Sequence, residues 1–127
     1  MSILLSGDGT NLRKKGAHYE ALAAGYLKSL GWEFLEHSYR RRTGEVDLIM
    51  KDGETYVFVE VKYRSSGAYG MPAESVSFRK KQHIIRTSET WLLEHGLSGV
   101  PVRFDIAEVV GSRIRILRNA FGARSVL

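Results

Sequence analysis

The chain of 127 residues has no cysteine, no apolar run of membrane-spanning length and no segment resembling a signal peptide. Without cysteine, disulfides and thiolate zinc sites are excluded. A membrane span needs roughly 18 consecutive apolar residues. The first residues, MSILLSGDG, lack a basic region and a long apolar stretch. We therefore expect a protein without membrane segments, cytoplasmic by default.

Several familiar catalytic motifs are also missing. The nearest approach to a glycine-rich phosphate loop, Gly7-Asp8-Gly9, lacks the flanking strand and helix that such a loop requires. Serine–histidine–aspartate chemistry has no local signature. The histidines show no metal-ligand spacing, so we expect surface or core-edge positions for all of them: His18, His37, His83 and His95.

The composition fits one globular domain with a basic surface. The chain is 43% hydrophobic, carries a formal net charge of +5 and has a pI of about 9.6. A chain of this length forms a single core, and it contains no repeat or internal linker. We expect residues 1–10 and 119–127 to be frayed. The positive charge permits binding to phosphate polyanions without demonstrating it.

The apolar periodicity predicts two helices and five strands in the order α-β-β-β-α-β-β. Ser77 is the expected N-cap of the second helix, and Gly31 and Gly96 follow the expected helix ends. This order implies a single α/β domain with a central mixed sheet flanked by helices. The predicted helices are 11–30 and 77–95, the strands are 33–39, 46–50, 55–62, 102–110 and 113–117, and 40–44 and 64–75 are a basic turn and a loop.

The third predicted strand ends in a charged pair. The segment TYVFVEVK, residues 55–62, has the composition of a buried strand and ends in Glu60-Val61-Lys62. Side chains alternate along a strand, so Glu60 and Lys62 share one face and Val61 takes the other. An acid and a lysine at the end of a strand of Tyr, Val and Phe indicate a site rather than a core.

Asp47 lies on the preceding strand, and an Asp52-Gly53 turn makes the two strands antiparallel neighbours. Counting outward from that turn places Asp47 near residues 57–58, two or three residues short of Glu60. A bulge or a splayed strand end would bring the two carboxyl groups together. By strand alternation, Glu45 shares the face of Asp47.

Two carboxylates and a lysine suit metal-dependent phosphodiester chemistry. Mg²⁺ and Mn²⁺ prefer oxygen ligands, and a bound divalent ion polarises a phosphate and lowers the pKa of water. A nearby lysine can orient that water or stabilise charge on the phosphate. Asp47, Glu60 and Lys62 supply this set. Spacing alone leaves open an alternative, in which they form a hairpin-end acid and a Glu–Lys pair on a solvated face.

Each predicted helix carries one charged residue on an apolar stripe. An unpaired buried charge is costly, so Glu20 needs a lysine, a metal ion or solvent as its partner. The stem of Lys80 can follow the core while its ammonium reaches either the sheet or the solvent. The stripe of Glu20 contains Gly16, Ala17, Ala24 and Leu27, and that of Lys80 contains Ile84, Ser88 and Trp91.

Basic residues gather at three places, which are residues 40–42, Lys62 with Arg64, and residues 79–81. Three tyrosines lie among them. Beside a metal site, such clusters would position a phosphate backbone without reading base sequence. Charge runs also occur as solvated faces, and both interpretations stay open for residues 40–42.

The segments GEVDLI, residues 44–49, and VFVEVKYR, residues 57–64, resemble the YraN-type family of uncharacterised bacterial proteins. That family is similar to the archaeal Holliday junction resolvases and shares the PD-(D/E)xK nuclease fold. The likeness runs from about Lys15 to Leu117. It includes Gly16, Glu20, residues 76–80, Trp91-Leu92 and Arg103-Phe104-Asp105.

The resemblance implies metal ligands at Asp47, at Glu60 and at the carbonyl of Val61. Two positions depart from the family pattern. Val46 stands where the name of the motif puts a proline. Ser38 stands where the family often has asparagine.

The residues and the resemblance together predict a metal-dependent endonuclease acting on DNA, branched or otherwise structured. We expect Glu20, Asp47 and Glu60 to hold Mg²⁺ or Mn²⁺, with Glu20 reaching the metal through water or a second ion. Lys62 is the motif's lysine and would assist the attacking water. The residues expected to contact phosphates are Arg40, Arg41, Arg42, Arg64 and Lys80.

Two other functions stay open. The chain could be a nucleic-acid-binding module that keeps the fold without turnover, or a protein-interaction factor with a basic surface. A homodimer would suit a symmetric DNA substrate, but nothing in the sequence requires one.

Overall fold

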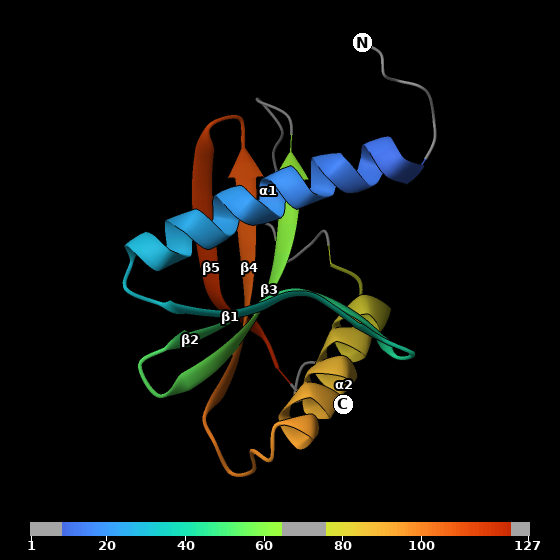
Figure 1. The fold of residues 1–127 in the computed structure, drawn as a ribbon, viewed down its shortest axis with the longest axis vertical. Helices are drawn as coiled ribbons and strands as arrows, with labels where there is room; N and C mark the ends of the chain where they lie inside the picture. The colour runs from blue at the N-terminus through green and yellow to red at the C-terminus, as the bar shows by residue number, and fades with distance from the viewer. Residues whose placement is uncertain (1–8, 65–75, 123–127) are drawn as a thin grey trace.

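A computed structural model describes residues 9–64 and 76–122, with side chains from Gly16 onward (Figure 1). The predicted α/β class and element order are confirmed. The elements are α1 (Gly9–Ser29), β1 (Glu33–Arg41), β2 (Gly44–Asp52), β3 (Thr55–Arg64), α2 (Phe78–Glu94), β4 (Val102–Val110) and β5 (Arg113–Phe121). Most of the predicted loop, residues 65–75, lies outside the described residues.

Several predicted strand ends are wrong. β2 extends two residues beyond each end of the predicted 46–50, and β3 continues to Arg64. β1 continues through Arg41, so the basic turn between β1 and β2 is shorter than expected. β5 continues to Phe121, so residues 119–121 are not frayed. Asn119 has a φ of +53° and lies where the β4–β5 register shifts. That irregularity breaks the alternation of apolar residues, which is why the pattern predicted an earlier end. The other residues expected to be frayed, 1–8 and 123–127, lie outside the described residues.

The five strands form one mixed sheet in the order β1-β2-β3-β4-β5. β3 and β4 are parallel, and the other neighbours are antiparallel. The parallel pair needs a crossover connection, and α2 lies within it. Among the described residues, no helix is both long and apolar enough to cross a membrane.

The helices cover opposite faces of the sheet. Phe58 and Ile49 pack with Ile84 and Trp91 of α2 in one core cluster. Met50, Val57 and Val59 pack with Leu27 of α1 in the other. Each fully buried large side chain contributes roughly 1.5–3 kcal/mol to folding. Because residues alternate between the faces, Asp47 and Glu60 point to the side of α2, like Ile49 and Phe58.

The β2–β3 turn sets the register that matters most for function. Asp52 pairs with Thr55, so the two-residue turn is Gly53-Glu54, and Gly53 takes a φ of +62°, a conformation that favours glycine. The predicted register centred the turn one residue earlier and is wrong by two to three residues. Leu48 pairs with Val59, and continuing this register places Asp47 opposite Glu60.

The N-terminus of α2 is capped as predicted. The side chain of Ser77 accepts a hydrogen bond from the backbone N–H of Lys80, with 3.1 Å between Oγ and N. Such a cap satisfies one of the free N–H groups of the first turn. It therefore fixes the turn that carries Lys80.

Candidate functional site

The candidate site lies where the described β2–β3 ladder ends, beyond the Leu48–Val59 pair. The backbone N–H of Val61 donates a hydrogen bond to Oδ2 of Asp47, with 2.8 Å between the two atoms. The Asp47 carboxylate is thereby held against the strand that carries Glu60. The predicted association of these two acids needs no bulge, because the register itself brings them together.

Two further carboxyl groups join Asp47. Carboxylate oxygens of Glu20, Glu45 and Asp47 lie within 4.8 Å of one another. Oxygens on opposite sides of an octahedral Mg²⁺ are about 4.2 Å apart, so small side-chain movements would let these groups share an ion. Glu20 reaches the cluster from α1, and the Ser38 hydroxyl donates to its Oε1 at 3.1 Å.

Glu45 was not predicted as a member of the site. Its position two residues before Asp47 on β2 gives both side chains the same face of the sheet. That spacing was the available signal. Below, the acid cluster means Glu20, Glu45, Asp47 and Glu60.

Glu60 is buried, with 3% of its side chain exposed, and it contacts two lysines. Its Oε2 lies 2.7 Å from Nζ of Lys80 and 3.6 Å from Nζ of Lys62. The sequence suggested Lys62 as the partner of Glu60, yet Lys80 of α2 makes the shorter contact. The sequence left open whether the Lys80 ammonium reaches the sheet or the solvent, and its contact with Glu60 shows that it reaches the sheet.

Burial and mutual repulsion make two of the acids harder to ionise. Burial raises the pKa of Asp47 well above its ordinary value, the charge of Glu60 adds to this rise, and the Val61 N–H offsets part of it. Burial also raises the pKa of Glu20, against the opposing effect of the Ser38 hydrogen bond. Within the described parts of the chain, no ion pair neutralises Glu20 or Asp47.

Lys80 stays charged inside this cluster. Burial alone would lower the pKa of its ammonium, but the hydrogen bond to Glu60 and the charges of Glu60 and Asp47 outweigh burial and raise that pKa. Lys80 is therefore a permanent cation beside the acids at neutral pH.

Two hollows open onto the acid cluster from different sides. One, of about 300 Å³, lies between β2 and α2 and is also lined by Arg79 and His83. The other, of about 230 Å³, lies between α1 and β3 and is also lined by Lys62. Asp47, Glu60 and Lys80 line both hollows. A ligand could therefore reach the acids from either side.

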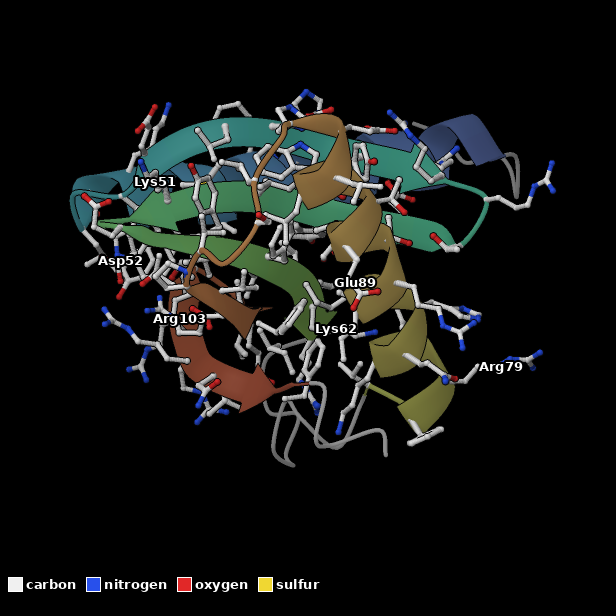
Figure 2. All side chains as sticks on the ribbon, turned by 90° about the horizontal axis from the view of Figure 1, so that it is seen from below. Lys51, Asp52, Lys62, Arg79, Glu89 and Arg103 are labelled. Atoms are coloured by element: carbon white, nitrogen blue, oxygen red, sulfur yellow. The ribbon has the colours of Figure 1, made fainter. Side chains whose placement is uncertain are left out.

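The predicted phosphate-binding arginines of the β1–β2 region differ in solvent exposure and in their contacts with acidic side chains. Arg40 is 68% exposed and contacts Glu45, with 3.0 Å between Nη2 and Oε1. Arg42 is exposed in the turn. Arg79, from the first turn of α2, also extends away from the body of the protein (Figure 2). Arg40 contacts Glu45 of the acid cluster, and Arg79 lines the hollow between β2 and α2.

Two other predicted phosphate contacts are engaged within the chain. Arg41 binds Glu94 through Nε and Nη2, both at 2.9 Å, and its guanidinium lies over the Tyr39 ring. Arg64 forms an ion pair with the buried carboxylate of Glu108. A phosphate would have to compete with these acids for Arg41 and Arg64.

Comparison with known proteins shows the family to which the chain belongs. Residues 19–109 match the family described as "Uncharacterised protein family UPF0102". The chain is a member of UPF0102. The match spans all four acids of the cluster and both lysines. The resemblance to YraN-type proteins is thereby confirmed, and because UPF0102 is uncharacterised, membership assigns no activity.

Individual UPF0102 proteins match over most of their length. One from Serratia proteamaculans (strain 568) is 43% identical over 113 residues, covering 87% of this chain and 97% of the relative. One from Clostridioides difficile (strain 630) is 42% identical over 113 residues, covering 87% and 99%. The UPF0102 protein YraN of Salmonella agona (strain SL483) is 42% identical over 115 residues, covering 89% and 88%.

Proposed function

We propose that this UPF0102 protein is a metal-dependent DNA endonuclease that hydrolyses phosphodiester bonds in branched or structured DNA. The observation that carries the proposal is the acid cluster, in which no ion pair among the described residues involves Glu20 or Asp47 while the adjacent Glu60 binds two lysines. Clustered acids with raised pKa values in a cleft are a feature of functional sites. The choice of branched DNA rests on the resemblance to the Holliday junction resolvases.

The donor set suits Mg²⁺ or Mn²⁺. Every side-chain donor in the acid cluster is an oxygen, which hard divalent cations prefer. Asp47, Glu60 and the carbonyl of Val61 would hold the ion, and Glu20 would contact it through water or a second ion. Both lysines contact Oε2 of Glu60, so a cation could bind Oε1 without breaking either pair. When bound, the ion would supply Lewis acidity toward a phosphate oxygen and a water of lowered pKa.

The side chains around the ion would perform the remaining steps. The ammonium of Lys62 would orient the attacking water, and that of Lys80 would stabilise negative charge as it develops on the phosphate. Because the pKa of Lys80 is raised, its charge is present throughout the neutral range. Arg40, Arg42 and Arg79 would bind flanking phosphates, since their side chains extend into solvent.

Cleavage of labelled DNA tests the proposal. We expect a four-way junction to be cut in Mg²⁺ or Mn²⁺ and to remain intact in a chelator. Asp47→Asn should lower the rate by about 100-fold or more, comparable to losing one transition-state contact. Glu54→Gln is the matched control, because Glu54 is an exposed acid in the β2–β3 turn outside the cluster. A flap and a linear duplex complete the substrate panel.

Other results would contradict the proposal. Cleavage that Asp47→Asn leaves unchanged would show that the acid cluster is not responsible. Salt-sensitive DNA binding without cleavage in either metal would identify a binding module. No retention of DNA even at low salt would favour a protein-interaction factor.

A further inference from the structure

A third hollow lies beside the acid cluster, between α1 and β1. Its volume is about 340 Å³, within the range of small-ligand sites. Most of its lining is apolar. The residues that form its base and walls are Ala21, Ala24, Gly25, Leu48, Phe34 and His37. We refer to this hollow as the α1–β1 groove.

Small side chains on α1 keep the groove open. A Cβ atom built on Gly25 would meet no other atom within 4 Å. On the opposite wall, the Phe34 ring is 36% exposed, and its centroid is 6.1 Å from that of His37. Aromatic rings that line an open apolar recess offer a surface on which a planar ligand can stack.

The rim of the groove is polar and connects to the acid cluster. The Ser38 hydroxyl lies between Nδ1 of His37, at 3.2 Å, and Oε1 of Glu20, at 3.1 Å. Glu20 lines both the groove and the hollow that contains Asp47 and Glu60. Nζ of Lys28 lies 6.0 Å from the centre of the Phe34 ring. The groove therefore combines an apolar base, hydrogen-bonding groups and a cation.

Ser38 itself is held in a strained conformation. Its φ of +52° lies in the left-handed region, which non-glycine residues adopt at a steric cost. His37 and Tyr39, on either side of Ser38, pair with Leu48 and Val46, the two neighbours of Asp47 on β2. Ser38 therefore lies opposite Asp47, between that residue and the groove. This conformation holds the Ser38 hydroxyl against Glu20, between the two sites.

We infer that the α1–β1 groove receives one unpaired base of the DNA, next to the phosphodiester bond at the acid cluster. This inference rests on the proposed function. Because Glu20 lines both the groove and the hollow of the acid cluster, a base in the groove and a phosphate at the cluster can belong to the same DNA strand. Lys28 complements the negative backbone, and the His37 and Ser38 groups can hydrogen-bond to base edges.

The groove specifies the class of DNA more narrowly than the acid cluster does. A base inside a duplex is stacked on both sides and cannot enter a recess unless it leaves the helix. For a base that is already unpaired, the free energy of unstacking is small or zero. The preferred substrate is therefore DNA in which an extrahelical or single-stranded nucleotide adjoins the bond that is cut.

Binding without cleavage tests this inference. The DNA is a duplex with one extrahelical 2-aminopurine, compared with the same duplex fully paired, in a chelator. Ala21→Leu fills the groove, and Leu22→Ala is its matched control, because Leu22 is the next residue of α1, 41% exposed and outside the groove. Thermal unfolding confirms that both variants fold.

We expect the wild-type protein and Leu22→Ala to prefer the extrahelical base and to change 2-aminopurine emission on binding. Ala21→Leu should lose this emission change and bind the extrahelical substrate roughly 5- to 100-fold more weakly, as loss of one stacked base does. Its affinity for the paired duplex should stay unchanged. Phe34→Ala should act in the same direction.

Equal weakening of both DNAs by Ala21→Leu, no weakening of either, or no DNA binding by the wild-type protein would overturn the inference. Conversion of a dimer to a monomer by Ala21→Leu would instead assign the groove to a second copy of the chain. The wild-type protein separates the two proposals. If it cleaves no DNA in Mg²⁺ or Mn²⁺ but keeps its preference for the extrahelical base in a chelator, only the proposed function fails.

Discussion

Two charged clusters lie beside β3, and they differ in how their acids are neutralised. In the first, Arg103 binds both carboxylate oxygens of the fully buried Asp105 at 3.0–3.2 Å and also Asp52 at 3.1 Å. The backbone N–H of Asn119 donates to the same Asp105 at 2.9 Å. Figure 2 shows Asp52 and Arg103 close together, away from Lys62. The second is the acid cluster, where no described side chain forms an ion pair with Glu20 or Asp47.

The two clusters differ in whether their buried carboxylates are paired with a cation within the described residues. Removing an ion from water is costly, and a paired and hydrogen-bonded partner offsets that cost in the Arg103 cluster. At Asp47 the Val61 N–H offsets only part of that cost, and burial and the charge of Glu60 raise its pKa. Under the proposed function, a bound divalent cation would offset this remaining cost and stabilise the folded state.

Removing the cation of the Arg103–Asp105–Asp52 cluster should have the largest effect on the free energy of unfolding. Arg103→Met leaves Asp105 buried without its cation, so we expect the free energy of unfolding to fall by about 3–5 kcal/mol. Urea denaturation measures this. Arg118→Met is the matched control, because Arg118 also lies over the Trp32 ring, at 5.4 Å against 5.0 Å for Arg103, but is exposed. A loss equal to that of the control would show that Asp105 needs no cation.

Binding of a divalent metal ion at the acid cluster should have the next largest effect on the free energy of unfolding. With Mn²⁺ at about 100 times its dissociation constant, bound metal should stabilise the wild-type protein by about 2.7 kcal/mol. Asp47→Asn removes a ligand charge and should abolish most of this gain, whereas Glu54→Gln should retain it. Thermal unfolding with and without Mn²⁺ measures both. Equal stabilisation of Asp47→Asn would exclude Asp47 as a ligand.

The pH dependence of stability should reveal the cost at Asp47 directly. In the folded protein Asp47 ionises at a higher pH than its ordinary value of 3.8. The folded state therefore binds this proton more tightly than the unfolded state. As pH rises from that ordinary value through the raised one, the free energy of unfolding should fall by about 1.4 kcal/mol per unit of pKa difference.

Asp47→Asn supplies the reference for this measurement. Asparagine keeps an acceptor oxygen for the Val61 N–H but does not ionise. Metal-free urea denaturation of both proteins across the acidic and neutral range should show the wild type losing stability relative to the variant. A relative gain with rising pH would mean that Asp47 is stabilised, not strained, as an anion.

The exposed pair at the edge of the cluster should matter least for folding. Arg40→Gln breaks a solvent-exposed contact with Glu45, so stability should change by less than about 1 kcal/mol. The same change should weaken DNA binding and reduce the salt slope of the affinity by about 1. Mn²⁺ should bind no more weakly. A titration in which DNA affinity is unaffected would remove Arg40 from the proposed interface.

Local patterns in the sequence predicted most of the fold. Strand alternation put Glu60 and Lys62 on one face, and Ser77 was recognised as the N-cap of α2. All seven elements appear in the predicted order. The end of β5 was misplaced because the irregular backbone at Asn119 interrupts alternation.

The candidate site was only partly predictable. The acids at Glu20, Asp47 and Glu60 were all proposed from the sequence, but the register between β2 and β3 was not, because it depends on which two residues form the turn. Glu45 was overlooked although its spacing from Asp47 was visible. The strained Ser38 and the groove beside it have no signature in local composition.

Composition and periodicity were sufficient to predict the order of the helices and strands, the helix cap and most of the candidate acids, because these depend on neighbours along the chain. Tertiary structure decided which charges are balanced. Arg103 meets Asp105 and Asp52, and Lys80 meets Glu60, while Glu20 and Asp47 meet other acids. The energy of a charge depends on its burial and its distance from other charges, and packing sets both.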